Sequence, residues 1–572
     1  MKIETERTAE ELERQIAELP IGYISKKMIH GKPYYYQQWT ENGKTRSICM
    51  KKEEAEELKV LIEKRKSLQK QLKGLKRIST RQAEVRMPEV DLETNTLYGR
   101  QLLDMAQMAE GLEVRDCFST VQSYLDGKTG DKVCLILGLR RTGKTTLFRQ
   151  AVLHMTRQQQ ARTVYIRLTA RDTIESLNRD LKKLGRAGYR CILIDEITLL
   201  PDFLHSATLF SDIYAAQGMK IVLSGAHSLG LWFALQKLYD RAVVARTTFI
   251  PYREHSRLLK IDSVDEYIRH GGTLYDAMPH DEAGGEGVET ASFRGAESTR
   301  HYIDNAVCQN IVHSLSDGGA GQAKNLPAMP DAAELSCAIY RVIEEMNEEF
   351  AMRVVKASLK THRLESMAAV PGREKLPAGY TEEHIAEIKQ YLTALDLIAP
   401  CPTESLAAEP KIAETMLFTQ PGMRYCQAQA LIHRLVRSKW SEDLSERERK
   451  LLGDRILEEI REQMLRDLVL LETARTANKG KRAFRLRFAE SEFDMVIYHE
   501  ETNTCELYAV RYSDMQVPTQ YRDLTEPEKT EQTRRRFGAI TKRCVLYRGT
   551  NDVTDEGITY QNVEEYLSAL PH

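Results

Sequence analysis

One glycine-rich stretch combines the residue types that bind the phosphates of a nucleotide. It matches the pattern GxxxxGK[ST] at every fixed position, with Gly138, Gly143, Lys144 and Thr145. Glycines let successive backbone N–H groups turn toward phosphate oxygens, while a lysine bridges the β- and γ-phosphates and a threonine hydroxyl ligates Mg²⁺. The stretch therefore predicts a site for ATP and Mg²⁺. The residues expected to bind the nucleotide are Gly138, Arg141, Thr142, Gly143, Lys144, Thr145 and Thr146.

Two adjacent carboxylates follow an apolar run further along the chain. The run CILIDE ends in Asp195 and Glu196, and Asp195 comes 51 residues after Lys144. An aspartate here would hold Mg²⁺ together with Thr145, and the glutamate would act as general base or orient the attacking water. An acidic pair at the end of a strand is on its own typical of a surface turn. The phosphate-binding stretch upstream favours the metal-binding and catalytic roles.

Further polar side chains are candidates for the same site. The run KIVLSG ends in Ser224, and His227 and Ser228 follow within four residues. Each could reach the attacking water or the γ-phosphate, and a capped strand-to-helix turn is the alternative; we name Ser224 as the catalytic candidate. Arg241 is expected to contact the γ-phosphate, in cis or from a neighbouring subunit, and to stabilise transition-state charge there. An exposed surface arginine is the competing interpretation.

The elements that must position these residues are short apolar strands separated by helices. Four runs, VCLILG, TVYIRL, CILIDE and KIVLSG, are typical of strands buried on both faces of a sheet. The stretches between them are helical in pattern, which predicts βαβ units and a parallel sheet flanked by helices. We therefore expect an α/β P-loop domain over residues 100–272, and residues 82–110 are expected to be a linker that leads into a helix.

Residues 1–82 are predicted to form a separate basic module. The turn sequences HGK and ENGK divide a partly alternating stretch into three short antiparallel strands, and a long polar helix follows. Between Ile21 and Arg81 the chain carries sixteen Lys and Arg residues against six Glu residues. Such a basic surface suits contact with a nucleic-acid backbone, and a solvated oligomerisation arm is the alternative. The aromatic residues interleaved with it are Tyr34, Tyr35, Tyr36 and Trp39.

Two more regions follow the α/β domain. Residues 273–440 are mostly helical in pattern and include YTEEHIAEIKQYLTALDLI, which is like the last helix of a winged-helix module, and residues 450–572 are mixed α and β.

The 572 residues carry a net charge of −1 and are 42% hydrophobic, which excludes global disorder. Since no apolar stretch reaches 18 residues, no membrane span is expected. The acidic, polar N-terminus is unlike a signal peptide, so we expect a cytoplasmic location.

Several segments, in the same order, resemble the AAA-type P-loop ATPases of prokaryotes, in the archaeal-type branch with a C-terminal nuclease-like domain. They include KVCLILGLRRTGKTTL, ILIDEITLL, IVLSGAHS, TQPGMRYCQAQALI and EFDMVIYHEETNTCELYAV. The resemblance implies ATP hydrolysis with Mg²⁺ and a PD-(D/E)XK nuclease fold for residues 450–572. Asp240 and Arg241 stand where the family usually has Gly and Arg, so the arginine is retained in a changed loop.

The nuclease-like segment departs from its family pattern at the metal-binding residues. Asp494 matches the first acid, but Ala509 and Arg511 stand where Glu-x-Lys is usual, and Arg466 stands where an acid is usual. Glu506 cannot replace the missing acid, because an odd offset from Ala509 in a strand points to the opposite face. We therefore expect a degenerate nuclease domain that still binds DNA through a basic neighbourhood, with a solvated surface as the alternative. This neighbourhood is Arg534, Arg535, Arg536, Lys542 and Arg543.

The favoured function is a Mg²⁺-dependent AAA-type ATPase, coupled to DNA through the N-terminal module and the C-terminal region. One alternative is a nucleotide-dependent switch that acts on a protein partner without nucleic acid. Another is a nuclease gated by ATP, against which Ala509 and Arg511 argue. A homo-oligomer is expected if Arg241 acts on a neighbouring subunit, and no membrane partner is expected.

Overall fold

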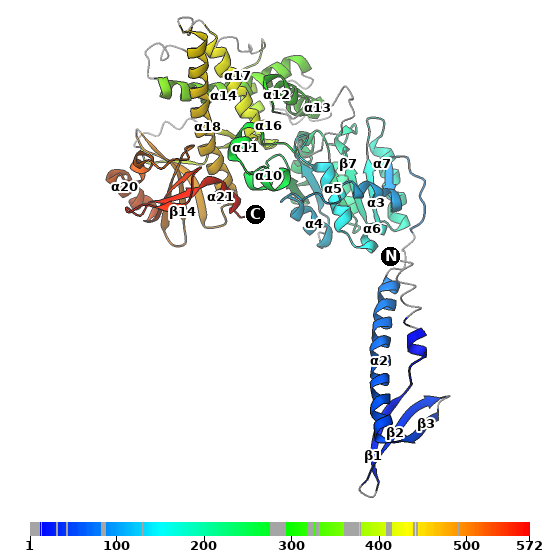
Figure 1. The fold of residues 1–572 in the computed structure, drawn as a ribbon. Helices are drawn as coiled ribbons and strands as arrows, with labels where there is room; N and C mark the ends of the chain where they lie inside the picture. Colours follow the sequence, from blue (N-terminus) through cyan, green and yellow to red (C-terminus); the bar gives the residue numbers. More distant parts are fainter. Residues whose placement is uncertain are drawn as a thin grey trace. The chain divides into compact units, whose positions relative to one another are not determined.

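The computed structural model divides the chain into two compact units, residues 1–86 and residues 87–572 (Figure 1). The structure describes residues 12, 14–29, 32–41, 44–81, 87–128, 130–274, 293–316, 325–326, 331–359, 377, 379–407, 415–438, 441, 444–489 and 491–571. Within these residues no helix is long and apolar enough to cross a membrane.

The first unit is a three-stranded antiparallel sheet followed by one long helix. Ala55 and Ile62 of this helix are buried two turns apart, and Ile16 before the sheet is buried as well. Arg65 donates a hydrogen bond of 2.7 Å to the Ile16 carbonyl, which ties the segment before the sheet to the helix. No side chain described in the three strands is fully buried, so their aromatic and basic residues reach solvent. The elements are β1 (Tyr23–Ile29), β2 (Lys32–Glu41), β3 (Lys44–Met50) and α2 (Lys52–Arg81).

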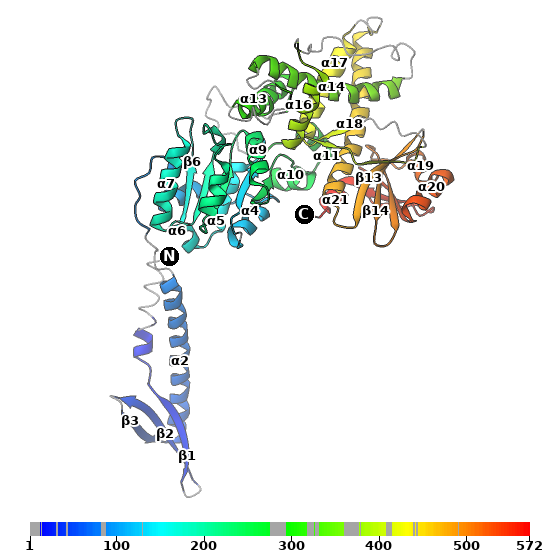
Figure 2. The same cartoon turned by 180° about the vertical axis from the view of Figure 1, so that it is seen from behind.

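The second unit contains a six-stranded sheet with the order β4-β6-β7-β8-β5-β9. All neighbouring pairs run parallel except β4 and β6, which confirms the expected parallel core. Every residue of β5 and β7 is buried, because helices cover both faces of the sheet (Figure 2). The strands are β4 (Thr96–Tyr98), β5 (Val133–Leu137), β6 (Thr163–Arg167), β7 (Cys191–Asp195), β8 (Lys220–Ser224) and β9 (Ala242–Arg246).

Alternating side chains of β5 divide the core of this sheet into two layers. Val133 and Leu135 pack in a cluster with helices α7 and α9, whereas Cys134 and Ile136 pack in a cluster with α3, α4 and α5. The strand is thus held from both sides up to the point where the glycine-rich stretch begins. The helices are α3 (Gly99–Gln107), α4 (Phe118–Asp126), α5 (Lys144–His154), α6 (Arg157–Ala161), α7 (Ile174–Ala187), α8 (Ala207–Leu209), α9 (Ser228–Leu238) and α10 (Tyr252–Leu259).

The segment that we expected to be a linker leading into a helix does lead into helix α3, but it also contains the edge strand β4, so the linker expectation is wrong at residues 96–98. Asp180 of α7 is fully buried and accepts hydrogen bonds from the N–H groups of Glu93, at 2.9 Å, and Thr94, at 2.8 Å. These bonds fix the chain on the sheet before α3 begins. A strand of three residues is too short to show the two-residue alternation by which strands are recognised.

A helical region follows the sheet and packs against the long helix α18. Val355 of α14, Leu431 of α17 and Ile456 of α18 belong to one buried cluster. The short strands β10 (Ile398–Pro400) and β12 (Met416–Phe418) form an antiparallel pair. The helices are α11 (Val264–His270), α12 (Ala296–Tyr302), α13 (Gln309–Ser316), α14 (Ala332–Leu359), α16 (Glu382–Ala394), α17 (Pro421–Val436) and α18 (Glu446–Thr476).

The C-terminal region is a seven-stranded mixed sheet with the order β11-β13-β14-β15-β16-β18-β17. Its edge strand β11 comes from the range that we assigned to the helical region, and it pairs parallel with β13. The boundary expected between residues 440 and 450 therefore cuts through this sheet, with β11 before it and the other six strands after it. The elements are β11 (Thr403–Ser405), β13 (Lys481–Arg487), β14 (Glu492–His499), β15 (Thr504–Val510), α19 (Arg522–Thr525), α20 (Pro527–Phe537), β16 (Ala539–Tyr547), β17 (Asp552–Val553), β18 (Thr559–Asn562) and α21 (Val563–Ser568).

Candidate phosphate-binding and catalytic site

The glycine-rich loop connects the C-terminal end of β5 to the N-terminus of α5. Gly143 caps the helix with a φ of 85°, in the left-handed region that side chains disfavour. A Cβ at Gly138 would lie 1.8 Å from Oγ1 of Thr247, so that position also requires glycine. Lys144 is the first residue of α5, and its ammonium donates hydrogen bonds of 2.8 Å to the carbonyls of Gly138 and Leu139. The lysine thus spans the loop, which leads into a helix N-terminus suited to anions.

The remaining expected nucleotide ligands also lie in or just after the loop. Arg141 has a φ of 64°, and its carbonyl accepts a hydrogen bond of 3.0 Å from Leu274 N–H. Thr142 is fully buried, and its hydroxyl lies 2.8 Å from the Leu139 carbonyl, so this side chain supports the loop. Thr146 is half-buried in the first turn of α5.

The charge of Lys144 responds to its surroundings. Desolvation of the ammonium lowers the pKa of Lys144 to about 8, while Glu196 and Asp195 oppose this shift. The group is still mostly protonated at pH 7. Phosphate oxygens beside it would favour the charged form further, because an opposite charge nearby raises the pKa of an amine.

Asp195 is the point at which several predicted residues meet. It ends β7 and is 3% exposed, and its Oδ2 accepts hydrogen bonds of 2.9 Å from the hydroxyls of Thr145 and Tyr165. Its Oδ1 accepts from the Ser224 hydroxyl and, at 3.1 Å, from the N–H of Glu196. A hydroxyl and a carboxylate side by side are the oxygen ligands that Mg²⁺ prefers. Tyr165, on the neighbouring strand β6, was not among the predicted residues, because no motif marks it.

Glu196 is held in a constrained conformation next to Asp195. Its φ of 61° lies in the left-handed region, which costs a non-glycine residue about 1 kcal/mol. Its Oε2 accepts a hydrogen bond of 2.8 Å from the N–H of Ala226, in the turn after β8. The carboxylate therefore has a fixed direction, as an orienting group or general base requires.

The structure separates the three polar residues that were expected near the attacking water. Ser224 bonds to Asp195, whereas Ser228 bonds to the backbone of Gly138 through its hydroxyl. The His227 ring stacks on His313, with centroids 3.8 Å apart. Burial and then the neighbouring His313 lower the pKa of His227 to about 3, so the ring is neutral at pH 7.

Arg241 does not lie at the loop of its own chain, so the expected contact in cis is wrong. Its carbonyl accepts a hydrogen bond of 3.0 Å from Val133 N–H, at the start of β5, whereas the loop follows the other end of that strand. β5 has five residues and is about 15 Å long, so Arg241 and the loop lie at opposite ends of this strand. The Arg241 side chain is partly buried in an ion pair with Asp212. A contact with a neighbouring subunit stays a prediction.

Comparison with known families agrees with this geometry. Residues 130–255 match a family described as an AAA domain. This segment is an AAA-type P-loop ATPase domain. Residues 2–60, which include β1–β3, match a domain of unknown function (DUF6788).

Two solved structures are similar to parts of the chain. The Walker-type ATPase PABY2304 of Pyrococcus abyssi is 12% identical, covers 57% of this chain and 99% of its own, and has a TM-score of 0.30. PCH-2 of C. elegans is 13% identical, covers 52% of this chain and 69% of its own, and has a TM-score of 0.19. Neither likeness carries a conclusion about this chain. No curated protein matches it.

A buried ion pair that no sequence motif indicated supports the loop of the AAA domain. Both oxygens of Glu254 accept hydrogen bonds from Arg115, at 2.8 and 2.9 Å. Arg115 also donates bonds of 2.7 Å to the carbonyls of Thr142 and Thr247. The guanidinium thus joins the loop, the end of β9 and helix α10. No local pattern marks either residue, because the partners are 139 positions apart.

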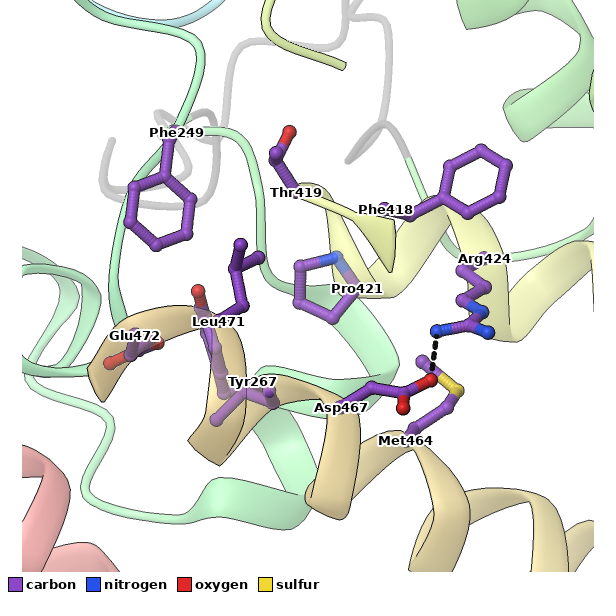
Figure 3. Close-up of a pocket in the computed structure, with 11 residues that line it drawn as sticks. Phe249, Tyr267, Phe418, Thr419, Pro421, Arg424, Met464, Asp467, Leu471 and Glu472 are labelled. Carbon is purple, nitrogen blue, oxygen red and sulfur yellow. Dashed lines mark hydrogen bonds and ion pairs between the residues drawn. The ribbon is translucent and has the colours of Figure 1, made fainter. Parts of the chain in front are cut away.

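A pocket lies next to the end of the AAA domain. It is lined by Phe249 of that domain and by two acids of α18, Asp467 and Glu472 (Figure 3). Asp467 pairs with Arg424 at 2.8 Å and with Arg485 at 2.7 Å. Glu472 accepts a hydrogen bond of 2.7 Å from Tyr252 N–H at the start of α10. Burial raises the pKa of Glu472 to about 8. This contact joins the AAA domain to the helix that packs on the C-terminal sheet.

The C-terminal acid Asp494 lies among positively charged side chains. Its Oδ2 accepts bonds from Val510 N–H at 2.8 Å and from Arg511 at 2.7 Å, and Arg466 is 3.6 Å from Oδ1. The strand register places Glu506 on the other face from Ala509, as predicted, and Glu506 bonds to His499. Among the described residues no group of three His, Cys, Asp or Glu side chains is arranged to hold a metal ion.

The expected basic neighbourhood is spread over two elements. Arg534, Arg535 and Arg536 are exposed in the last turn of α20, where Arg535 pairs with Glu531 at 3.0 Å. Arg543 of β16 donates to the Leu524 carbonyl, so its guanidinium is partly engaged. Contact of this surface with DNA stays a prediction.

Proposed function

We propose that the chain is an ATPase that binds ATP with Mg²⁺, hydrolyses it, and couples hydrolysis to DNA. The observation that carries this proposal is the 2.9 Å contact between Thr145 and Asp195, beside Lys144 and Glu196. This contact supports the proposal because a hydroxyl and a carboxylate side by side are the oxygen ligands that Mg²⁺ prefers, and both lie beside the loop proposed to bind the nucleotide. The match of residues 130–255 to the AAA domain supports it.

Each polar residue of the site has a separate role in this proposal. The loop amides and Lys144 would bind the phosphates, and Thr145 and Asp195 would hold Mg²⁺, which neutralises charge that develops on the phosphates. Glu196 would orient the attacking water and accept its proton. Ser224 would orient Asp195 through the hydrogen bond that its hydroxyl donates.

The first experiment measures ATP turnover by the purified chain with Mg²⁺, with Lys144→Ala as the inactive control. Lys144→Ala is expected to abolish tight ATP binding, because no other ammonium spans the loop carbonyls of Gly138 and Leu139 among the described residues. Normal ATP binding by Lys144→Ala would show that the loop is assigned wrongly. Binding without turnover in the wild type would favour the nucleotide-dependent switch.

DNA is the partner that we propose for the N-terminal sheet. Tyr23 and Tyr34 are exposed, and Lys27 lies 5.4 Å from the ring centre of Tyr36. Exposed lysines between aromatic rings suit a phosphate backbone. Double-stranded DNA is therefore expected to stimulate ATP turnover at low salt, and the stimulation is expected to fade as salt rises.

A charge reversal separates this contact from general electrostatics. The pair Lys26→Glu and Lys27→Glu should weaken DNA binding and reduce the slope of log K against log salt by about 0.9 for each phosphate that the protein no longer neutralises. Lys182→Glu, which changes an exposed lysine on α7, is the control and should leave the slope unchanged. Turnover that is indifferent to DNA at every salt concentration would instead favour the switch that acts on a protein partner.

A further inference from the structure

The turn between β8 and α9 touches both the catalytic carboxylate and the glycine-rich loop. Ala226 N–H donates to Glu196, and the Ser228 hydroxyl bonds to Gly138. His227 N–H donates to Thr198 Oγ1 at 3.3 Å, just after Glu196 in the chain. The direction of the Glu196 carboxylate therefore depends on the conformation of this turn.

One side chain from the helical region clamps the turn at both ends. Asn310 of α13 is 1% exposed; its Oδ1 accepts from Leu229 N–H at 3.0 Å, and its Nδ2 donates to the Ala226 carbonyl at 3.2 Å. An N–H only donates and a carbonyl only accepts, so both contacts require the same orientation of the amide. The stack of His313 on His227 is a second contact between α13 and the turn.

We propose that Asn310 is a positioning residue for ATP hydrolysis. By holding the Ala226 carbonyl, it fixes the residue whose N–H directs Glu196, and it places that direction under the control of α13. This inference rests on the proposed function, because it assigns a residue to the same hydrolytic site. It gives the helical region a direct route to the rate of hydrolysis without any contact with the nucleotide.

The expected effect is on the rate of hydrolysis rather than on binding. Asn310 makes no contact with Lys144 or Thr145 among the described bonds, so the phosphate-binding residues keep their partners when it is changed. A displacement of about 1 Å in a catalytic group costs up to about a hundredfold in rate. Asn310→Leu is therefore expected to lower kcat by roughly tenfold or more, while KM changes by less than about twofold.

The test compares Asn310→Leu with Gln309→Ala, which changes the exposed preceding residue of the same helix. Steady-state turnover gives kcat and KM, a fluorescent ATP analogue gives affinity, and thermal unfolding confirms that each variant is folded. If Asn310→Leu unfolds below the assay temperature, Asn310→Asp replaces it. That variant keeps the acceptor for Leu229 N–H, but it replaces the donor to the Ala226 carbonyl with a carboxylate oxygen that repels this carbonyl and carries negative charge.

The double variant with Glu196→Gln decides whether Asn310 acts through Glu196. If it does, Asn310→Leu costs nothing further in the Glu196→Gln background, since coupled residues are not additive. An unchanged kcat in Asn310→Leu, or the same fold reduction in both backgrounds, would overturn the inference. Absence of turnover in the wild type, or turnover unaffected by Glu196→Gln, would instead overturn the proposed function.

Discussion

Asp195 of the AAA domain and Asp494 of the C-terminal sheet are both buried aspartates on strands, yet their partners differ in charge. Asp195 accepts bonds from the hydroxyls of Thr145, Tyr165 and Ser224 and from a backbone N–H. These donors are all neutral. They satisfy the oxygens and leave the negative charge of the carboxylate uncompensated by any guanidinium among the described contacts.

Asp494 has one backbone donor and two arginines. Burial alone would raise the pKa of Asp494, but Arg466 and Arg511 lower it below its usual value. The carboxylate is therefore ionised, and its charge is already balanced within the protein. A divalent cation would have to displace these guanidinium groups, whereas at Asp195 it would meet a hydroxyl and a negative charge without a guanidinium beside it.

The two sites thus share the same buried acid and differ in the groups that contact it. Both aspartates were found from sequence, one by a phosphate-binding motif and one by resemblance to a nuclease family. The partners of the two carboxylates distinguish them, because at Asp494 two arginines lie against the carboxylate oxygens, whereas at Asp195 the described donors are neutral.

The largest expected effect comes from removing the charge of each aspartate in turn. Asp195→Asn should lower Mg²⁺-dependent ATP turnover by about two to three orders of magnitude, because it removes a preorganised charged group from the site. Asp494→Asn should change turnover by less than about twofold. Phosphate release at saturating ATP measures both. Equal reductions in the two variants would break the comparison and implicate the C-terminal sheet in hydrolysis.

The parts of the site that were predictable are local in the sequence. The loop follows β5 and opens α5 without a gap, and Asp195 ends an apolar run, so strand ends and motif together indicate one edge of the sheet. Arg241 could have been placed correctly had β9 been recognised as a strand, because a residue before a parallel strand lies at the edge opposite the loop. The run AVVAR is as long as the strands that were recognised, but arginines lie at both ends of its apolar part and only one of its five residues is buried, so it lacks the continuous apolar run that marks β5 and β7.

The supporting residues were not predictable, because their partners lie far apart in the chain. Arg115 and Glu254 are 139 positions apart, and Asn310 lies 84 positions from Ala226. A buried arginine or asparagine has no local signature that distinguishes it from an exposed one. The same limit applies to Arg466, whose partner Asp494 is on a different element and whose charge balance is visible only in the folded chain.

A smaller effect is expected from breaking the charge balance at Asp494. Arg511→Met should lower the free energy of unfolding by about 2 kcal/mol, since a buried carboxylate is deprived of one partner but keeps Arg466 and the Val510 N–H. Arg535→Met is the matched control, because it removes an exposed ion pair with Glu531 that contributes about 0.5 kcal/mol or less. Urea unfolding measures both.

The destabilisation in Arg511→Met should also depend on pH. The depressed pKa of Asp494 stabilises the folded chain above the pKa of the unfolded carboxyl, and this contribution disappears as the pH falls through the folded value. The difference between wild type and Arg511→Met should therefore shrink in acid. A difference that stays constant down to about pH 3, below the usual pKa of an aspartate, would mean that the arginine stabilises the sheet by packing instead of by charge.

The last effect concerns Glu472, a buried carboxylate that accepts a hydrogen bond from the backbone N–H of Tyr252. Burial raises the pKa of Glu472 to about 8, so the folded chain binds a proton that the unfolded chain has released between about pH 4.5 and pH 8. Stability should fall with rising pH across this window, because the folded state binds more protons there. Glu472→Gln stays neutral and can still accept the bond from Tyr252 N–H.

Glu472→Gln should therefore gain stability relative to wild type as the pH rises from about 5 to about 8, by about 1 kcal/mol or more. Glu458→Gln, at an exposed position of the same helix, should follow the wild-type curve. Urea unfolding at several pH values gives the three curves. If the free energies of unfolding of wild type and Glu472→Gln change in parallel with pH, Glu472 is ionised in the folded chain. Its charge is then stabilised by a positive charge, as that of Asp494 is. The contact between α10 and α18 would then be electrostatic, and its strength should fall with salt.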